Sequence, residues 1–215
     1  HKVEGLENPM DKLEAVIRDY FVKAGFDEVK VHTLVDNKEQ WADVVSLDNS
    51  LTAERDTLRN RLSVNLGKVL EYNIKHLDLV SKDRTVFKDE DKVKLFEIGN
   101  VFTDAKPNVI ESNHLSFGVG VFKWPKGQSA EFYIDEIYKD LLNLLKFKET
   151  LSSKVNLYAN TLEIDLQELL EKVDLNILNT LMGDISEYKS PEEKIYKKAS
   201  IYPAMSRDIA FFGSN

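Results

Sequence analysis

The side chains best suited to chemistry in this sequence are its four histidines, because the chain contains no cysteine. They are His1, His32, His76 and His114. No two of them stand at the short spacing typical of zinc ligands, so the sequence predicts no zinc site. His32 and His114 fall in strand-like runs, where a cleft could use them, although a surface or strand position is the plainer interpretation.

Carboxylates are numerous, but their positions favour solvated surfaces over a metal site. Asp89, Glu90 and Asp91 form a run in a charged segment that we expect to be a loop. A magnesium site requires carboxylates held in octahedral geometry, which such a run does not provide. Residues 135–136 and 168–171 are typical of exposed helix faces. We therefore predict no metal in this chain.

Phosphate-binding and nucleophilic motifs do not occur either. The sequence has no G-x-x-x-x-G-K-[ST] loop, and Gly118-Val119-Gly120 lies within a strand-like run without a third glycine. Ser206-Arg207-Asp208 after Pro203 is typical of a turn leading into a strand. With cysteine absent, a thiolate nucleophile is excluded as well. We predict no catalytic residues, and we expect the chain to hold partners rather than to make or break bonds.

The composition is that of a folded globular protein. The chain has 215 residues, 42% of them hydrophobic and 31% charged, with a net charge of -8. An acidic balance argues against a free-standing nucleic-acid binder, which must displace counterions from phosphates. No apolar run reaches the ~20 residues of a membrane span, and the start has no apolar signal core. We expect a cytoplasmic protein, and we expect the chain to be part of a longer one.

Hydrophobic spacing predicts helices and strands that do not alternate as regular crossover units. We expect helices over residues 9–24, 38–44, 57–76, 128–147 and 167–172. We expect strands over residues 26–35, 45–47, 93–102, 114–122, 154–158, 161–166, 197–202 and 208–212. Residues 78–91 indicate an exposed loop, 106–108 a turn, and 174–192 a mixed segment. Hairpins and long excursions join the strands, so we predict an α+β fold with a mainly antiparallel sheet flanked by helices.

Four strings, taken in order, resemble a known family. Phe21-x-x-x-Gly25-Phe26-Asp27-Glu28-Val29 resembles motif 1 of the class II aminoacyl-tRNA synthetases. Residues 47–73, 95–102 and 202–210 resemble patterns of the β subunit of bacterial-type phenylalanyl-tRNA synthetase. The residues that carry these β-subunit motifs are Leu58, Arg59, Phe96, Glu97, Gly99, Phe102, Pro203, Arg207 and Asp208.

This resemblance implies a class II synthetase-like antiparallel sheet flanked by helices. It implies a catalytic-like core over residues 1–200 and the start of a ferredoxin-like anticodon-binding domain over 201–215. In the family, α and β subunits form a heterotetramer that joins phenylalanine to tRNA(Phe) with ATP and magnesium. For this chain the resemblance implies no cofactor, with the α subunit as a direct partner and tRNA(Phe) bound by the holoenzyme.

Departures from the family's motifs point to an inactive module. Thr103 stands where the motif 2 arginine would bind the ATP α-phosphate, and a hydroxyl cannot replace that bidentate cation. Residues 161–166 have neither the glycines nor the arginine of motif 3. The motif 1 proline is absent, with His32 near its place, and the family's N-P-L-S is Asn-Ser-Leu-Thr at 49–52.

The β subunit's module is an inactive counterpart of the α subunit's active site, and we expect this chain to pack on that subunit. The expected interface residues are Phe21, Gly25, Phe26, Val29, Val31, Leu58, Leu62 and Leu66. An exposed apolar face over 13–31 or 58–73 would accompany such an interface. Two alternatives are a divergent active ATP-dependent ligase and an unrelated adaptor domain that shares short strings.

Overall fold

A computed structural model describes residues 8–36, 38, 43–50, 52, 55–76, 92–121, 124, 126–147, 151, 155–156 and 160–186. Its helices are α1 (Pro9–Lys23), α2 (Ser63–His76), α3 (Ala130–Leu144), α4 (Leu166–Lys172) and α5 (Leu175–Ser186). Its strands are β1 (Asp27–Glu28), β2 (Leu34–Val35), β3 (Val45–Ser46), β4 (Thr57–Leu58), β5 (Val93–Ala105), β6 (Asn108–Gly120), β7 (Val155–Asn156) and β8 (Thr161–Asp165).

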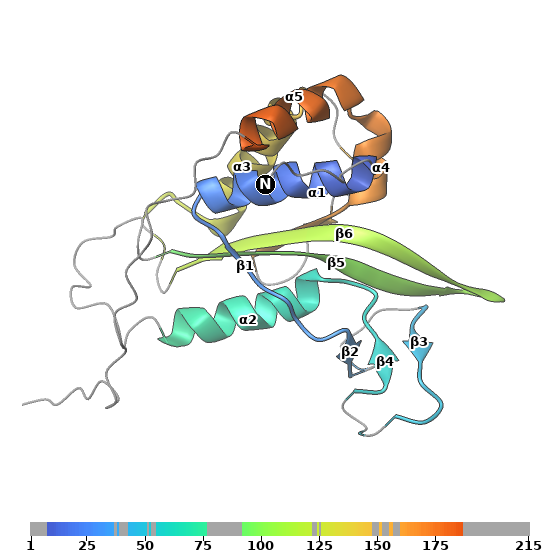
Figure 1. Ribbon diagram of the computed structural model, residues 1–215. Coiled ribbons are helices and arrows are strands. Elements are labelled where there is room, and N and C mark those ends of the chain that lie inside the picture. Colours follow the sequence, from blue (N-terminus) through green and yellow to red (C-terminus); the bar gives the residue numbers. More distant parts are fainter. Residues whose placement is uncertain are drawn as a thin grey trace, which may run out of the picture.

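The main sheet has five strands in the order β1-β5-β6-β8-β7. Only β1 and β5 run parallel; the other neighbours are antiparallel, which confirms the predicted sheet type. Strands β5 and β6 form one hairpin that pairs from Val93 and Gly120 to the turn at Ala105 and Asn108. A second, small sheet has the order β2-β4-β3. Figure 1 shows α1, α3, α4 and α5 on one face of the main sheet and α2 on the other.

Helix α1 begins and ends as its sequence predicts. The Asn8 side chain accepts a hydrogen bond from the Met10 N–H, and Pro9 takes the first helical position. Gly25 follows the helix with φ +80°, a conformation that a side chain would strain. One face of the helix enters the core through Leu13, Val16, Ile17 and Phe21.

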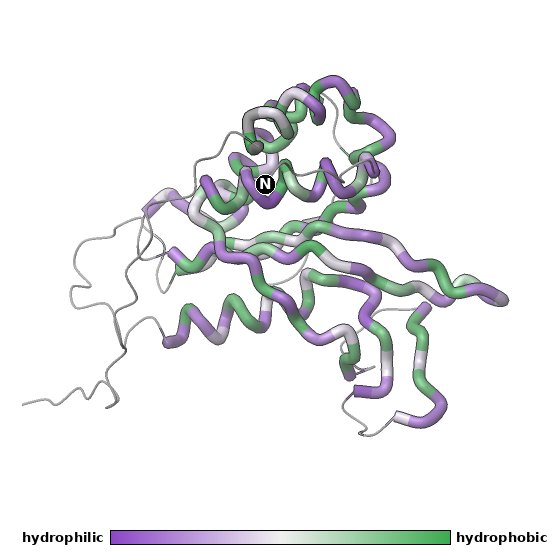
Figure 2. The backbone as a smooth tube through the Cα atoms, in the orientation of Figure 1, coloured by the Kyte–Doolittle hydropathy of each residue, from purple (hydrophilic) through white to green (hydrophobic). Residues whose placement is uncertain are grey.

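Aromatic rings join α1 to the sheet. The Phe21 ring stacks on Phe96 and meets Phe26 edge-on, in both cases with 5.0 Å between ring centroids. Phe117 of β6 also lies 5.0 Å from Phe21. These rings belong to the large core between the sheet and the four helices on that face. Figure 2 shows apolar residues recurring along the strands of the sheet and along the helices that cover it.

Two predicted elements begin or divide elsewhere. The helix expected over 57–76 starts at Ser63, because Thr57 and Leu58 pair with β2 and β3 in the small sheet. The strand expected over 26–35 is two short strands, β1 and β2. Between them the Val31 N–H donates to the side chain of Glu97 at 3.2 Å, so side-chain bonding replaces the ladder here.

The end of the described chain also differs from expectation. Residues 175–186 form α5, a helix, where the sequence indicated a mixed segment. Both hairpin strands are longer than expected, since β5 continues to Ala105 and β6 begins at Asn108. The predicted loop at 78–91 and strands at 197–202 and 208–212 lie outside the described residues, as do 201–215 and residues 39–42 of the helix expected over 38–44.

Candidate functional site

The sheet face that α2 covers carries a series of polar side chains, and Glu97 of the sequence motifs is one of them. Directly opposite residues of antiparallel strands point to the same face. Gly118 faces α2, because a Cβ there would lie 3.2 Å from the Leu70 side chain. By register and alternation, the same face presents Glu97, Gly99 and Thr103 of β5, His114 and Ser116 of β6, and Glu163 and Asp165 of β8.

Arg59 and Glu97 form a buried ion pair on this face. Arg59 Nη1 lies 2.7 Å from Glu97 Oε1, and the two side chains are 5% and 1% exposed. Arg59 also donates from Nε to the Asn100 carbonyl at 3.0 Å and from Nη1 to the Val31 carbonyl at 3.2 Å. Burial raises the pKa of Glu97, and the Arg59 guanidinium opposes that rise. The guanidinium is therefore engaged within the chain.

Glu163 occupies the N-terminus of α2. Its carboxylate accepts from the Leu62 N–H at 3.1 Å and from the Ser63 N–H at 2.8 Å. His114 Nδ1 lies 2.8 Å from the same carboxylate. Burial acts to raise the pKa of Glu163, but the contacts with His114 and Ser63 outweigh it, so the pKa is lowered. The side chain satisfies helix N–H groups that have no partner within the helix.

Helix α2 packs tightly on the remainder of this face. A Cβ at Gly118 would lie 3.2 Å from the Leu70 side chain, and one at Gly120 would lie 2.1 Å from the Ile74 side chain. At Gly99 a Cβ would come within 2.5 Å of Arg59 Nη2. The chain's own side chains thus occupy the space above three glycines of the sheet.

Thr103 lies away from the polar cluster that Arg59, Glu97, His114 and Glu163 form beneath α2. It is on the part of the hairpin that extends beyond β8. It pairs with Ile110, two pairs before the turn, whereas β8 pairs only with His114 to Gly118. Thr103 is half-buried, and its hydroxyl supplies no positive charge. The strand expected to match motif 3 is β8, where Thr161 to Ile164 are buried.

Two hollows open near the sheet. One, of about 340 Å³, lies beside the ion pair and is lined by Lys30, Val31, Arg59, Glu97 and Gly99 among others. Glu97 Oε2 is buried there without a hydrogen-bond partner in the described part of the chain. The described residues contain no group of three histidines or carboxylates that could hold a metal ion.

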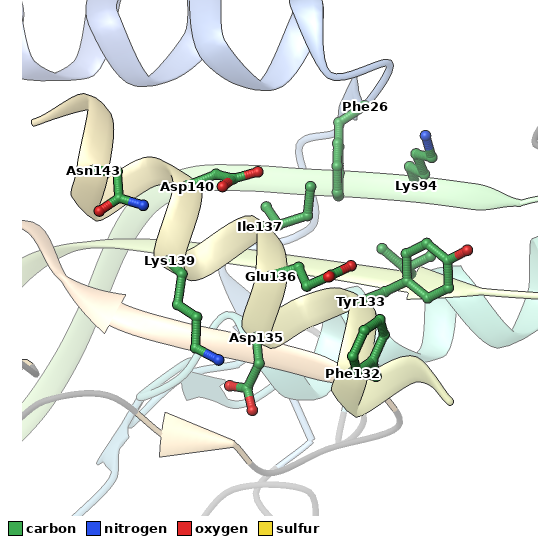
Figure 3. Close-up of a pocket in the computed structure, with 11 residues that line it drawn as sticks. Phe26, Lys94, Phe132, Tyr133, Asp135, Glu136, Ile137, Lys139, Asp140 and Asn143 are labelled. Carbon is green, nitrogen blue, oxygen red and sulfur yellow. The ribbon is translucent and has the colours of Figure 1, made fainter. Parts of the chain in front are cut away.

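The other hollow, of about 620 Å³, lies along α3. Figure 3 shows Tyr133 and Glu136 on the side of α3 that faces Phe26 and Lys94, whereas Asp135 and Lys139 point away. Of these residues only Phe26 belongs to the sequence motifs, and its side chain is buried in the core. The hollow is therefore a separate surface feature and not part of the polar cluster beneath α2.

Half of the predicted interface residues belong to the chain's own core. Phe21, Phe26, Leu62 and Leu66 are at most 3% exposed, so they offer no surface to a partner, and their assignment to an interface is corrected. Their helical and strand spacing reflects burial within the chain. Gly25 is exposed, and Val29, Val31 and Leu58 are half-buried.

The expected apolar face over 13–31 or 58–73 is not present among the described residues. In these two segments the large apolar side chains that are exposed are Val22 and Tyr72, one on α1 and one on α2. Others lie elsewhere: Leu47, Val109, Ile110, Phe132 and Leu175.

Of the motif residues, the structure brings Arg59, Glu97 and Gly99 together and places Phe96 in the core. Leu58 lies in β4, and the Phe102 N–H donates to the Arg59 carbonyl. Pro203, Arg207 and Asp208 lie outside the described residues. Sequence reasoning missed Glu163, because an acid alternating with Leu162 and Ile164 is the usual pattern of an exposed strand face.

An antiparallel sheet with this long hairpin and helices on both faces is the fold of the class II aminoacyl-tRNA synthetases. Two structures of pyrrolysyl-tRNA synthetase from Desulfitobacterium hafniense share it, each with a TM-score of 0.52 and 14% sequence identity. The alignments cover 75% of this chain and 67% or 68% of those chains. At this identity the likeness shows the fold alone.

The chain belongs to the phenylalanyl-tRNA synthetase beta chain CLM domain family, whose model matches residues 2–158. The phenylalanine–tRNA ligase beta subunit of Mesoplasma florum is 29% identical over 211 residues. That match covers 92% of this chain and 24% of the relative, so the chain spans about a quarter of the relative's length. Family membership excludes the unrelated adaptor. No helix in the described ranges is long and apolar enough to cross a membrane.

Proposed function

We propose that this chain is a non-catalytic class II synthetase-like module of a cytoplasmic phenylalanine–tRNA ligase. The module packs on the α subunit, and the holoenzyme aminoacylates tRNA(Phe) with phenylalanine and ATP. Magnesium and ATP are used at the α subunit, and this chain contributes to the assembly. The family match and the relative in Mesoplasma florum support the ligase assignment.

The observation that carries the non-catalytic role is the state of Arg59, the buried arginine on the α2-covered face among the residues that the structure describes. Amino acid activation requires a cation that is free to bind the ATP α-phosphate and to stabilise developing charge. Arg59 instead donates to Glu97 and to two carbonyls of its own chain. At position 103 the residue is threonine, which carries no charge.

Packing on the same face supports this role. An adenylate-forming site needs open space over the central strands for ATP and the amino acid. Here Leu70 and Ile74 of α2 lie directly over Gly118 and Gly120. A ligand would have to displace a buried helix face, at a cost of several kcal/mol for side chains of this size.

The test titrates the chain with ATP, phenylalanine and magnesium by calorimetry, alone and together with the α subunit from the same organism. Light scattering measures the mass of the mixture in parallel, with each protein alone as the control. We expect a complex of the two proteins, and ATP binding only when the α subunit is present. ATP binding by the chain alone would identify a divergent active ligase and overturn the proposal. A mixture that stays as separate proteins would contradict the packing role.

A further inference from the structure

Within the described ranges, no strand pairs with the outer edge of β6 over its first half. Strand β8 pairs with β6 from Gly118 to His114 and then turns into α4 at Leu166. Residues 108–113 pair with β5 on one side, and no described strand pairs with them on the other. Figure 1 shows this part of the hairpin extending beyond the helices.

The hydrogen-bond pattern shows which peptide groups face this edge. The Val29 N–H donates to the Phe96 carbonyl, so Phe96 directs its peptide groups away from β6. Its partner Phe117 then directs its N–H and C=O groups away from β5. Along β6 the peptide groups of successive residues point alternately toward β5 and away from it. The Val119 N–H also points away from β5, because it donates to the Asn160 carbonyl. Val109 and Glu111 therefore present N–H and C=O groups at the open edge.

This edge lacks the features that usually protect exposed strands. Natural edge strands are blocked by charged side chains, above all lysine, by proline or by bulges. Residues 108–113 contain neither lysine nor proline, and their pairing with β5 is continuous. Val109 and Ile110 are each 51% exposed and lie on opposite faces of the ribbon. The one charged side chain, Glu111, is held on the sheet by a hydrogen bond from Asn100 Nδ2.

We propose that this edge takes an extended segment of the catalytic α subunit as an additional strand beside β6. The inference rests on the proposed function, since it names that function's partner. Main-chain bonds to Val109 and Glu111 provide affinity, and apolar side chains that flank Val109 and Ile110 provide fit. A basic side chain opposite Glu111 completes the pairing, because oppositely charged neighbours across strands are favourable.

Charge argues against a second copy of the chain as the occupant. The only charged side chain of residues 108–113 is Glu111, so two copies would bring together two acidic edges. Each copy also has a net charge of -8, which opposes close self-association. A segment with one or two basic residues is complementary where a copy is not.

The test measures the affinity of the chain for the α subunit by titration calorimetry. Val109→Asp and Ile110→Asp place charges on the apolar faces of the ribbon, and we expect each to weaken binding by about tenfold or more. The matched control is Val22→Asp on α1, where the side chain is 61% exposed. We expect the control to bind as the unaltered chain does. Thermal unfolding of each variant verifies that the fold persists.

A backbone substitution tests strand addition directly. Glu111→Pro removes an N–H that faces the open edge and leaves the bonds to β5 intact, because the Phe102–Glu111 pair is not hydrogen-bonded. Glu111→Ala removes the same side chain and keeps the N–H. We expect the proline variant to bind about tenfold more weakly than the alanine variant. Hydrogen exchange at the Val109 and Glu111 amides is expected to slow in the complex.

The outcomes separate this inference from the proposed function. If the α subunit binds and all hairpin variants bind equally well, the inference is overturned and the proposed function stands. If the unaltered chain does not bind the α subunit, both fail. If the chain associates with itself and Ile110→Asp abolishes that association, the edge binds a second copy of the chain. That result would overturn the proposal that the α subunit occupies it.

Discussion

Arg59 Nη1 and Glu97 Oε1 lie 2.7 Å apart, in a pair that solvent scarcely reaches. Arg59 follows β4 of the small sheet, and Glu97 lies in β5 of the main sheet. The Arg59 carbonyl accepts from the Phe102 N–H, and the Arg59 N–H donates to the Thr33 carbonyl. Arg59 thus connects the small sheet to β5 of the main sheet. Its guanidinium and its peptide N–H and C=O groups all take part in that connection.

Removal of either member of this pair is expected to destabilise the fold. Arg59→Met and Glu97→Gln each leave the other group buried without its charge partner, which costs about 3–5 kcal/mol. The measurement is the free energy of unfolding from urea titration. The double variant should lose less than the sum of the two single losses, because no uncompensated charge remains.

An exposed pair serves as the control for this prediction. Lys23 and Asp19 are also 2.7 Å apart, but the Lys23 side chain is 59% exposed. Lys23→Met is expected to change the free energy of unfolding by less than about 1 kcal/mol. Equal losses in the free energy of unfolding for Lys23→Met and Arg59→Met would contradict the prediction that the buried pair stabilises the fold more than the exposed pair.

Gly118→Ala tests how closely α2 and β8 approach the sheet. Its Cβ would lie 2.8 Å from the Asn160 carbonyl oxygen, which is backbone and cannot swing aside. We expect a loss of about 1–3 kcal/mol in the free energy of unfolding. Gly183→Ala in α5 is the matched control, since apart from its chain neighbours and its own helix backbone no atom of the described residues lies within 4 Å of its Cβ position. That change should stabilise the protein by up to about 1 kcal/mol. If Gly183→Ala were the more destabilising of the two changes, the packing around Gly118 would not be as close as described.

Local patterns predicted the elements whose partners are also local. Asn8, Pro9 and Gly25 mark both ends of α1, and alternation marks the β5–β6 hairpin. The strand expected over 26–35 divides because Val31 bonds to Glu97, which lies 66 positions along the chain. No local pattern reveals such a partner.

The start of α2 and the role of Glu163 were hidden for a related reason. Leu58, Leu62 and Leu66 have helical spacing, which extended the expected helix back to 57. In the structure the helix begins where Glu163, about a hundred residues away, accepts its first N–H groups. Four of the residues that the family resemblance assigned to an interface are buried in the chain itself. Sequence patterns predict that a side chain is buried, and only the assembled fold shows against what.

Stability should depend on pH through Glu163 with a defined sign. Its pKa in the folded protein is lowered from the usual 4.5, so its stabilising contribution is present above that value and is lost as pH falls through the folded pKa. Glu163→Gln removes this titration. The stability gap between the unaltered chain and this variant should therefore narrow on acidification from about pH 6 to pH 3.

Unfolding by urea at a series of pH values measures that gap. Glu97 titrates with the opposite sign, because its pKa is raised, but it is common to both proteins and cancels in the difference. Glu168→Gln is the control, since Glu168 pairs with Lys172 at the surface of α4. A gap that stays constant with pH, or one that widens in acid, would show that the ionised Glu163 does not stabilise the N-terminus of α2.

Thr103→Arg asks whether the missing arginine alone explains the proposed inactivity. The residue lies on the two-stranded part of the hairpin, where a longer side chain can be accommodated. The variant supplies a cation, but α2 still lies over Gly118 and Gly120, and Arg59 still covers Gly99. We therefore expect no ATP binding by calorimetry and no phenylalanine-dependent exchange of pyrophosphate into ATP. Activity gained by this one change would mean that the face beneath α2 is open to ligands, in contradiction to the packing described above.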